Sequence, residues 1–183
     1  MNAHAIEKII KSAQPKVFPD KTAYNSISLS QIVQLSKATG VSSRQIEIMA
    51  LENGVVPERY ARNMKSFSPQ DQIALLKAQV SIVGLGGLGG TVVEILARIG
   101  IGILNVIDGD TFEESNLNRQ FLSIPEQMAK SKTDAAAQRI KTINSAIGKN
   151  YETQIKINLN ACQPGNHQPG LCYPGRQWNR NPG

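Results

Sequence analysis

Residues 80–89 read VSIVGLGGLG, a short β-branched run that leads directly into a glycine-rich turn. An apolar stretch that is typical of a helix follows over residues 91–99 and is closed by Gly100 and Gly102. A second β-rich run, residues 103–107, then ends at Asp108. Strand, glycine turn, helix and strand in this order open a doubly wound sheet. The sequence therefore predicts an α/β fold with a Rossmann-like doubly wound sheet.

Helical signals dominate the chain before this unit. Periodic apolar residues and helix-start signals predict helices over residues 5–13, 30–39 and 42–53, and from residue 68 onward. After the unit, a helix is expected over residues 131–144 and a third strand over residues 151–157. We expect three parts: a helical N-terminal extension (1–56), a nucleotide-binding domain (57–157) whose sheet is incomplete, and a disordered Pro/Gly-rich tail (158–183).

Composition sets broad limits on function. The chain has 183 residues and a formal charge of +6, which suits anionic ligands. The cations are scattered along the chain. Residues 30–51 could form a helix-turn-helix, but Glu47 and Glu52 on its second helix would repel the phosphates of DNA. Nucleic acid is therefore a disfavoured partner. Cys162 and Cys172 show neither metal-ligand spacing nor a disulfide framework. With no cationic-then-apolar leader and no apolar run of membrane-spanning length, we expect a cytoplasmic protein without membrane attachment.

The glycine turn is the first candidate binding element. Gly84, Gly86 and Gly89 fit the G-x-G-x-x-G pattern between a strand and a helix, where backbone N–H groups and the helix N-terminus favour phosphate. The alternative is a tight turn that binds nothing. Asp108 stands where an acidic side chain can accept hydrogen bonds from a ribose, or it can simply form the Asp-Gly-Asp turn.

The segment after Asp108 favours a triphosphate. Asn116 and Arg119 follow at short range, and Lys132 opens the next helix. Two cations and an amide near a glycine loop can surround a triphosphate, whereas a nicotinamide dehydrogenase needs no such cluster. The alternative is that Arg119 and Lys132 are solvated surface cations.

Together these segments carry a resemblance to a known family. Residues 82–89, the turn at 108–110, residues 116–120 and Lys132 resemble, in order and spacing, the signature of the ThiF/MoeB/HesA family. Members of that family activate ubiquitin-like sulfur-carrier proteins by adenylation. Upstream, residues 58–63 (ERYARN) are similar to the Arg-Tyr-x-Arg-Gln element that precedes the family's glycine loop. The resemblance covers residues 57–147.

The resemblance implies a reaction and a set of site residues. The reaction is attack by a carrier protein's C-terminal Gly-Gly carboxylate on the α-phosphate of ATP, with Mg²⁺ present, giving an acyl adenylate and pyrophosphate. Arg62 would be donated across a homodimer interface to the partner's ATP as an arginine finger. The resemblance also implies that Asp108 holds the ribose. The nucleotide would be cradled by Gly84, Gly86, Gly87 and Gly89, and its phosphates would be contacted by Asn116, Arg119 and Lys132.

The chain also departs from the family pattern. A Cys-Thr-Asp-Asn-like segment that supports Mg²⁺ in the family has no match in residues 148–183, so we assign no residue of this chain as a metal ligand. Ala129 stands where a glycine is usual, and Asn63 replaces a glutamine. Three functions therefore stay open: adenylation in impaired form, nucleotide binding without catalysis, and NAD-dependent oxidation and reduction.

Overall fold

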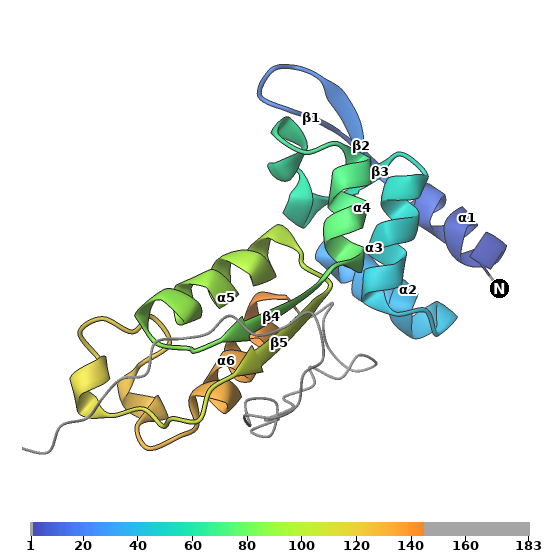
Figure 1. Cartoon of the computed structure of the whole chain (residues 1–183). Helices are drawn as coiled ribbons and strands as arrows, with labels where there is room; N and C mark the ends of the chain where they lie inside the picture. Colours follow the sequence, from blue (N-terminus) through green and yellow to red (C-terminus); the bar gives the residue numbers. More distant parts are fainter. Residues whose placement is uncertain (1, 145–183) are drawn as a thin grey trace, which may run out of the picture.

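A computed structural model describes residues 2–144. They form an N-terminal module (residues 2–77) joined to an α/β unit (residues 79–144) (Figure 1). The predicted third strand at 151–157 and the predicted disordered tail at 158–183 lie outside the described residues. Among residues 2–144, no helix is both long and apolar enough to cross a bilayer. The elements in chain order are α1 (Asn2–Ser12), β1 (Gln14–Val17), β2 (Ala23–Ile27), α2 (Leu29–Thr39), α3 (Ser43–Glu52), β3 (Val55–Pro57), α4 (Pro69–Lys77), β4 (Gln79–Val83), α5 (Gly87–Ile99), β5 (Ile103–Ile107) and α6 (Lys132–Ile143). Short 3-10 turns, η1 (Glu58–Tyr60), η2 (Asn63–Lys65), η3 (Glu114–Asn116) and η4 (Pro125–Gln127), connect them.

The α/β unit confirms the predicted βαβ core. β4 and β5 pair in parallel, from Gln79 beside Ile103 to Val83 beside Ile107. α5 and α6 pack on each other and on these strands, around buried Ile82, Leu104 and Val106. The carboxylate of Glu94 on α5 also pairs with Arg139 of α6 at 2.7 Å. The result is an α/β, Rossmann-like arrangement, of which the structure describes two strands.

The N-terminal module contains the expected helices and also a small sheet that the sequence did not predict. β1 pairs antiparallel with β2, and β2 pairs parallel with β3. β1 is exposed along its whole length and contains Pro15, so it shows neither the alternation nor the composition of an ordinary strand. α2 ends at Gly40, whose φ of 71° lies in the left-handed region. Buried Ile9, Ile27, Ile46 and neighbouring apolar side chains form the module's core.

Two glycines bring the module and the α/β unit into direct contact. A Cβ added at Gly100 would lie 2.7 Å from the ring of Tyr60, and one at Gly102 would lie 1.9 Å from the carbonyl oxygen of Leu76. Gly100 also adopts a φ of 94°, where larger residues are strained. Larger side chains at either position would therefore push the two parts of the chain apart.

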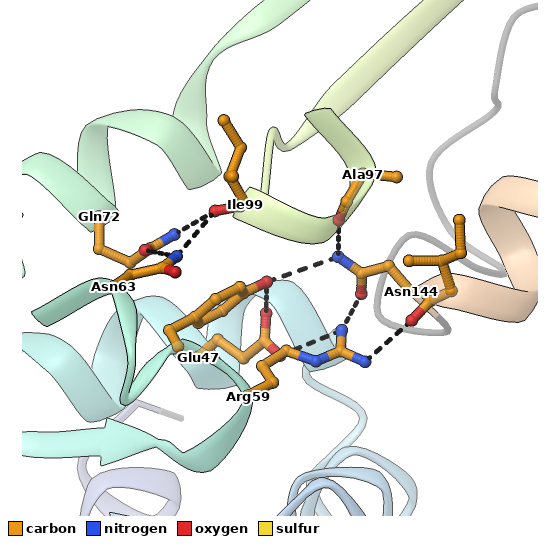
Figure 2. A network of polar contacts seen from close by, with 9 residues as sticks. Glu47, Arg59, Asn63, Gln72, Ala97, Ile99 and Asn144 are labelled. Atoms are coloured by element: carbon orange, nitrogen blue, oxygen red, sulfur yellow. Dashed lines mark hydrogen bonds and ion pairs between the residues drawn. The ribbon is translucent and has the colours of Figure 1, made fainter. Parts of the chain in front are cut away.

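A buried polar cluster crosses the same contact (Figure 2). We call Glu47, Arg59, Tyr60 and Asn144 the junction network. The Tyr60 hydroxyl donates to the Glu47 carboxylate at 3.4 Å and accepts from the Asn144 amide at 3.4 Å. Arg59 donates to the Asn144 side-chain oxygen and to the backbone carbonyl of Ile143. The network thus links α3 and η1 of the module to the end of α6.

Candidate functional site

The glycine loop joins the end of β4 to the start of α5. Gly84 has a φ of 89°, and its N–H donates to the carbonyl oxygen of Ile107 at 2.8 Å. A Cβ at Gly89 would lie only 1.7 Å from the carbonyl oxygen of Gly84. Because that neighbour is backbone, only glycine fits at position 89. The helix begins at Gly87 rather than near Thr91 as predicted, since the last glycines of the motif form its first turn.

The outer side of this loop is open. A Cβ placed on Gly84 or Gly86 would meet no heavy atom within 4 Å. The first N–H groups of a helix have no partner within the helix, and they carry the positive end of its dipole. The loop therefore presents unpaired donors to an open region, which is the arrangement that binds phosphate. A nucleotide's phosphates fit the residues found here.

Asp108 borders the loop from the end of β5. Its carboxylate accepts the N–H of Leu85 at 2.5 Å and, through its other oxygen, the N–H of Asp110 at 2.8 Å. Asp108 therefore forms the Asp-Gly-Asp turn, which is one of the two roles that the sequence suggested for it. The bond to Leu85 also fixes the carboxylate beside the glycine loop, where the ribose interpretation requires it.

The segment containing Asn116 and Arg119 passes directly against the loop. The backbone oxygen of Arg119 would lie 3.2 Å from a Cβ on Gly87. Asn116 is buried, and its side-chain oxygen accepts the N–H of Glu113 at 3.1 Å. The Arg119 guanidinium is exposed and donates to the carbonyl oxygen of Ser115 at 2.5 Å. Gln120 adds a buried side-chain oxygen for which residues 2–144 supply no hydrogen-bond donor.

Lys132 is held under the same region by a residue that the sequence analysis missed. Its ammonium lies 3.1 Å from the Asp110 carboxylate and 5.9 Å from the centre of the Phe112 ring. Lys132 is 5% exposed, so its interpretation as a solvated surface cation is wrong, whereas Arg119 is exposed. Asp110 could have been found from the Asp-Gly-Asp turn, which brings a second carboxylate to the end of the strand.

Arg62 does not join this site within its own chain. It follows Tyr60, whose ring packs at Gly100 beyond the C-terminal end of α5, while the glycine loop precedes the N-terminal end. At about 1.5 Å per residue, the helix separates these two ends by roughly 18 Å. Arg62 instead lines a pocket of about 390 Å³ beside the β1–β2 hairpin. The structure therefore gathers the other predicted site residues and leaves Arg62 apart.

Glu58, in the same pocket, is strongly engaged. It accepts hydrogen bonds from Ser26 at 2.5 Å and Tyr24 at 3.3 Å, and it pairs with Lys16 at 3.1 Å. Partial burial opposes the charge on Glu58, but the bonds from Ser26, Lys16 and Tyr24 outweigh it, so the pKa of this carboxyl lies below its ordinary value.

The structure bears on two further sequence-based interpretations, the helix-turn-helix and the metal site. Residues 46–51 of α3 are all buried, so this helix cannot lie in a groove of DNA as a recognition helix. Glu47 is fully buried, so the expectation that it repels phosphate from the surface is wrong for this residue. Within residues 2–144, no three His, Cys, Asp or Glu side chains come together as a metal site.

Part of this chain, including the glycine loop, is similar in sequence to known proteins. Residues 60–160 match the model of the ThiF family. The chain is 34% identical over 120 residues to the adenylyltransferase and sulfurtransferase MOCS3 of Arabidopsis thaliana, covering 63% of this chain and 26% of that protein. It is 37% identical over 92 residues to the SAMP-activating enzyme E1 of Haloferax volcanii, covering 49% of this chain and 34% of that protein. The chain thus spans a minor part of the length of these relatives.

Solved structures also match. One is the E. coli tRNA N6-threonylcarbamoyladenosine dehydratase TcdA in complex with AMP, at 30% identity and a TM-score of 0.48. The match covers 49% of this chain and 36% of that one.

Proposed function

Because the chain belongs to the ThiF family, we propose that its α/β unit binds ATP at the glycine loop and serves in adenylation of a carrier protein's C-terminal glycine carboxylate. The observation that carries the proposal is the open face of the loop, bordered by Asp108 and by the segment from Asn116 to Gln120. Relatives named as an adenylyltransferase and sulfurtransferase and as a SAMP-activating enzyme support this class of reaction. In this reaction the carboxylate attacks the α-phosphate of ATP, which gives an acyl adenylate and releases pyrophosphate.

In this proposal each residue has a role that is compatible with its position. The N–H groups at the start of α5 bind phosphate oxygens over Gly84, Gly86, Gly87 and Gly89. Asp108 accepts hydrogen bonds from the ribose. The ammonium of Lys132 binds a phosphate oxygen, either in place of the Asp110 carboxylate or together with it, and its buried charge therefore stays paired. Asn116 and Arg119 approach the phosphates from the neighbouring segment.

Two further parts of the proposal concern groups from outside the chain. Mg²⁺ would arrive with the nucleotide, since no cluster within residues 2–144 holds a metal by itself. Arg62 would act on the nucleotide of a second copy in a homodimer, because it is far from its own glycine loop. The carrier protein would be of the ubiquitin-like or sulfur-carrier kind and would end in Gly-Gly.

Nucleotide selectivity tests the binding step. Calorimetry with ATP, AMP and NAD should show tighter binding of ATP and AMP than of NAD, because the cations beside the loop complement terminal phosphates. Tighter binding of NAD would favour an oxidoreductase and would overturn the proposal. Pyrophosphate–ATP exchange in the presence of a Gly-Gly-ended carrier protein then tests the reaction. Nucleotide binding without exchange would assign this chain to the non-catalytic alternative.

A further inference from the structure

The β1–β2 hairpin lies at the end of the described chain away from the glycine loop (Figure 1), and a pocket lies beside it. One side is formed by the aromatic rings of Phe18 and Tyr24, which stack at 3.9 Å with 14° between their planes. The other side is formed by the segment from Glu58 to Arg62, and Lys16 completes the charged lining. Two cations and one carboxylate therefore face a space large enough for a small anion.

Glu58 and Arg62 would be expected to pair with each other. They are four residues apart, line the same pocket and carry opposite charges, which is the spacing at which side chains along a helical turn meet. Yet Glu58 is bonded to Ser26 and Tyr24 of β2 and to Lys16 of β1. Within residues 2–144, Arg62 makes no hydrogen bond or ion pair with any side chain. The hairpin therefore takes the carboxylate that would otherwise hold Arg62.

The backbone just before Arg62 is fixed by contacts with the hairpin and with the junction network. Glu58 is bound to the hairpin, while Arg59 and Tyr60 belong to the junction network. Tyr60 and Ala61 are both buried. Because its own turn is anchored, the backbone of Arg62 keeps a set position, while its exposed guanidinium has no side-chain partner among residues 2–144. An arginine held in this way is suited to a phosphate, which its planar fork of donors can bind at two points.

We propose that Lys16, Tyr24 and Ser26 act as positioning residues that hold Glu58 away from Arg62, so that Arg62 remains available to bind a phosphate group in this pocket. The source of that phosphate rests on the proposed function, which supplies the triphosphate of ATP bound to a second copy. Free inorganic phosphate has the same chemistry. The glycine loop of the same chain is too distant to present the phosphate itself.

Releasing Glu58 tests the proposal. In Lys16→Met/Ser26→Ala, Glu58 loses two of its three partners and can turn to Arg62. Adding Glu58→Gln removes this competitor and restores the net charge of the wild-type chain. The probe is tripolyphosphate, added to the full chain, and the readout is the Nε–Hε signal of Arg62 together with the amides of residues 58–62 by NMR.

We expect wild-type protein to show saturable shifts at Arg62. The double variant should bind tripolyphosphate at least fivefold more weakly, and the triple variant should return to within twofold of wild type. The matched control is Lys21→Met, which removes one positive charge from the same hairpin outside the pocket lining and should stay within twofold.

Three results would overturn the proposal. Lack of saturable shifts at Arg62 in wild type would remove the phosphate site. A triple variant as weak as the double variant would show that Lys16 is itself a ligand rather than a positioning residue. Should the double variant disturb the hairpin, Glu58→Gln alone still decides: it should bind at least as tightly as wild type, and fivefold weaker binding would refute the role of Glu58.

The same samples separate this proposal from the proposed function. AMP should shift the amides of residues 84–89, and lack of such shifts would contradict nucleotide binding at the glycine loop without touching the result at Arg62. ATP that shifts residues 84–89 and Arg62 together would identify the nucleotide of a second copy as the source. Shifts at Arg62 with inorganic phosphate but not with ATP would identify free phosphate.

Discussion

The buried carboxyl of Glu47 should make the stability of this protein fall as pH rises. Glu47 is fully buried, and burial raises its pKa from 4.5 to about 7, although the charge of Arg59 and the hydrogen bond from Tyr60 act in the opposite direction. Between these two pH values the folded protein keeps a proton on Glu47 that the unfolded chain has released. The stabilising contribution is therefore complete below pH 4.5 and is lost as pH rises through about 7.

The size of the effect follows from the shift. Each pKa unit corresponds to about 1.4 kcal/mol, so a shift of this size changes the free energy of unfolding by up to about 3 kcal/mol. Glu47→Gln keeps the shape and an acceptor for Tyr60 but cannot ionise. The variant should match wild type near pH 4.5 and exceed its melting temperature at pH 8. At about 2–4 °C per kcal/mol for a chain of this length, the gain should be roughly 6–12 °C.

Thermal unfolding followed by circular dichroism from pH 4.5 to 8 measures this difference. The matched control is Glu52→Gln, which removes one negative charge from the exposed end of the same helix, where Glu52 pairs with Lys77 at 3.7 Å. The control should follow the wild-type curve, because exposed pairs of this kind contribute little. A constant gap between wild type and Glu47→Gln across this pH range would show that Glu47 titrates alike in both states, and the reasoning would fail.

Five other changes have defined outcomes. Gly89→Ala should lower the free energy of unfolding by at least about 3 kcal/mol in urea titrations, because its Cβ would overlap the carbonyl oxygen of Gly84. Gly86→Ala should change the free energy of unfolding by no more than about 1 kcal/mol, and it should still weaken AMP binding in calorimetry. Lys132→Met should weaken ATP binding more than adenosine binding, since it removes a phosphate contact; an equal loss for both ligands would contradict that role. Ala129→Gly should raise stability by up to about 1 kcal/mol, since Ala129 has a φ of 62°, and a loss of stability would refute the strain. Ending the chain after residue 157 should leave the melting temperature unchanged, as the composition of residues 158–183 predicts, and limited proteolysis should remove that tail first.

Local signals in the sequence were sufficient for the centre of the fold. The glycine motif, the apolar helix after it and the β-branched runs on either side are contiguous, so their spacing alone predicts β4, α5 and β5. Capping was predictable for the same reason: Ser68 accepts the N–H of Asp71, and Asp71 accepts the N–H of Ser68. Residues 42–45 (SSRQ) have the sequence pattern of a capping box, and half of it forms, with Ser42 accepting the N–H of Gln45.

Features that depend on tertiary contacts were not predictable in this way. The junction network unites Glu47 and Asn144, which lie far apart along the chain, and no local pattern distinguishes Glu47 from an exposed helical glutamate. β1 is short and exposed, so its residues show no alternation of apolar and polar side chains. Within the candidate site, the pairing of Lys132 with Asp110 required the close approach of two segments that the sequence treats as separate.

The fit at Gly100 and Gly102 limits how the N-terminal module can be transplanted. Because Tyr60 and the backbone at Leu76 occupy the space that a side chain at these positions would need, the α/β unit carries part of the module's docking surface. A chimera that fuses residues 2–77 to another ThiF domain must therefore bring both glycines to the recipient. It must also supply an asparagine directly after the helix that corresponds to α6, to accept the hydrogen bond from Arg59. Without these three residues, the transplanted module would be joined to the recipient only through the linking peptide and would not pack against it.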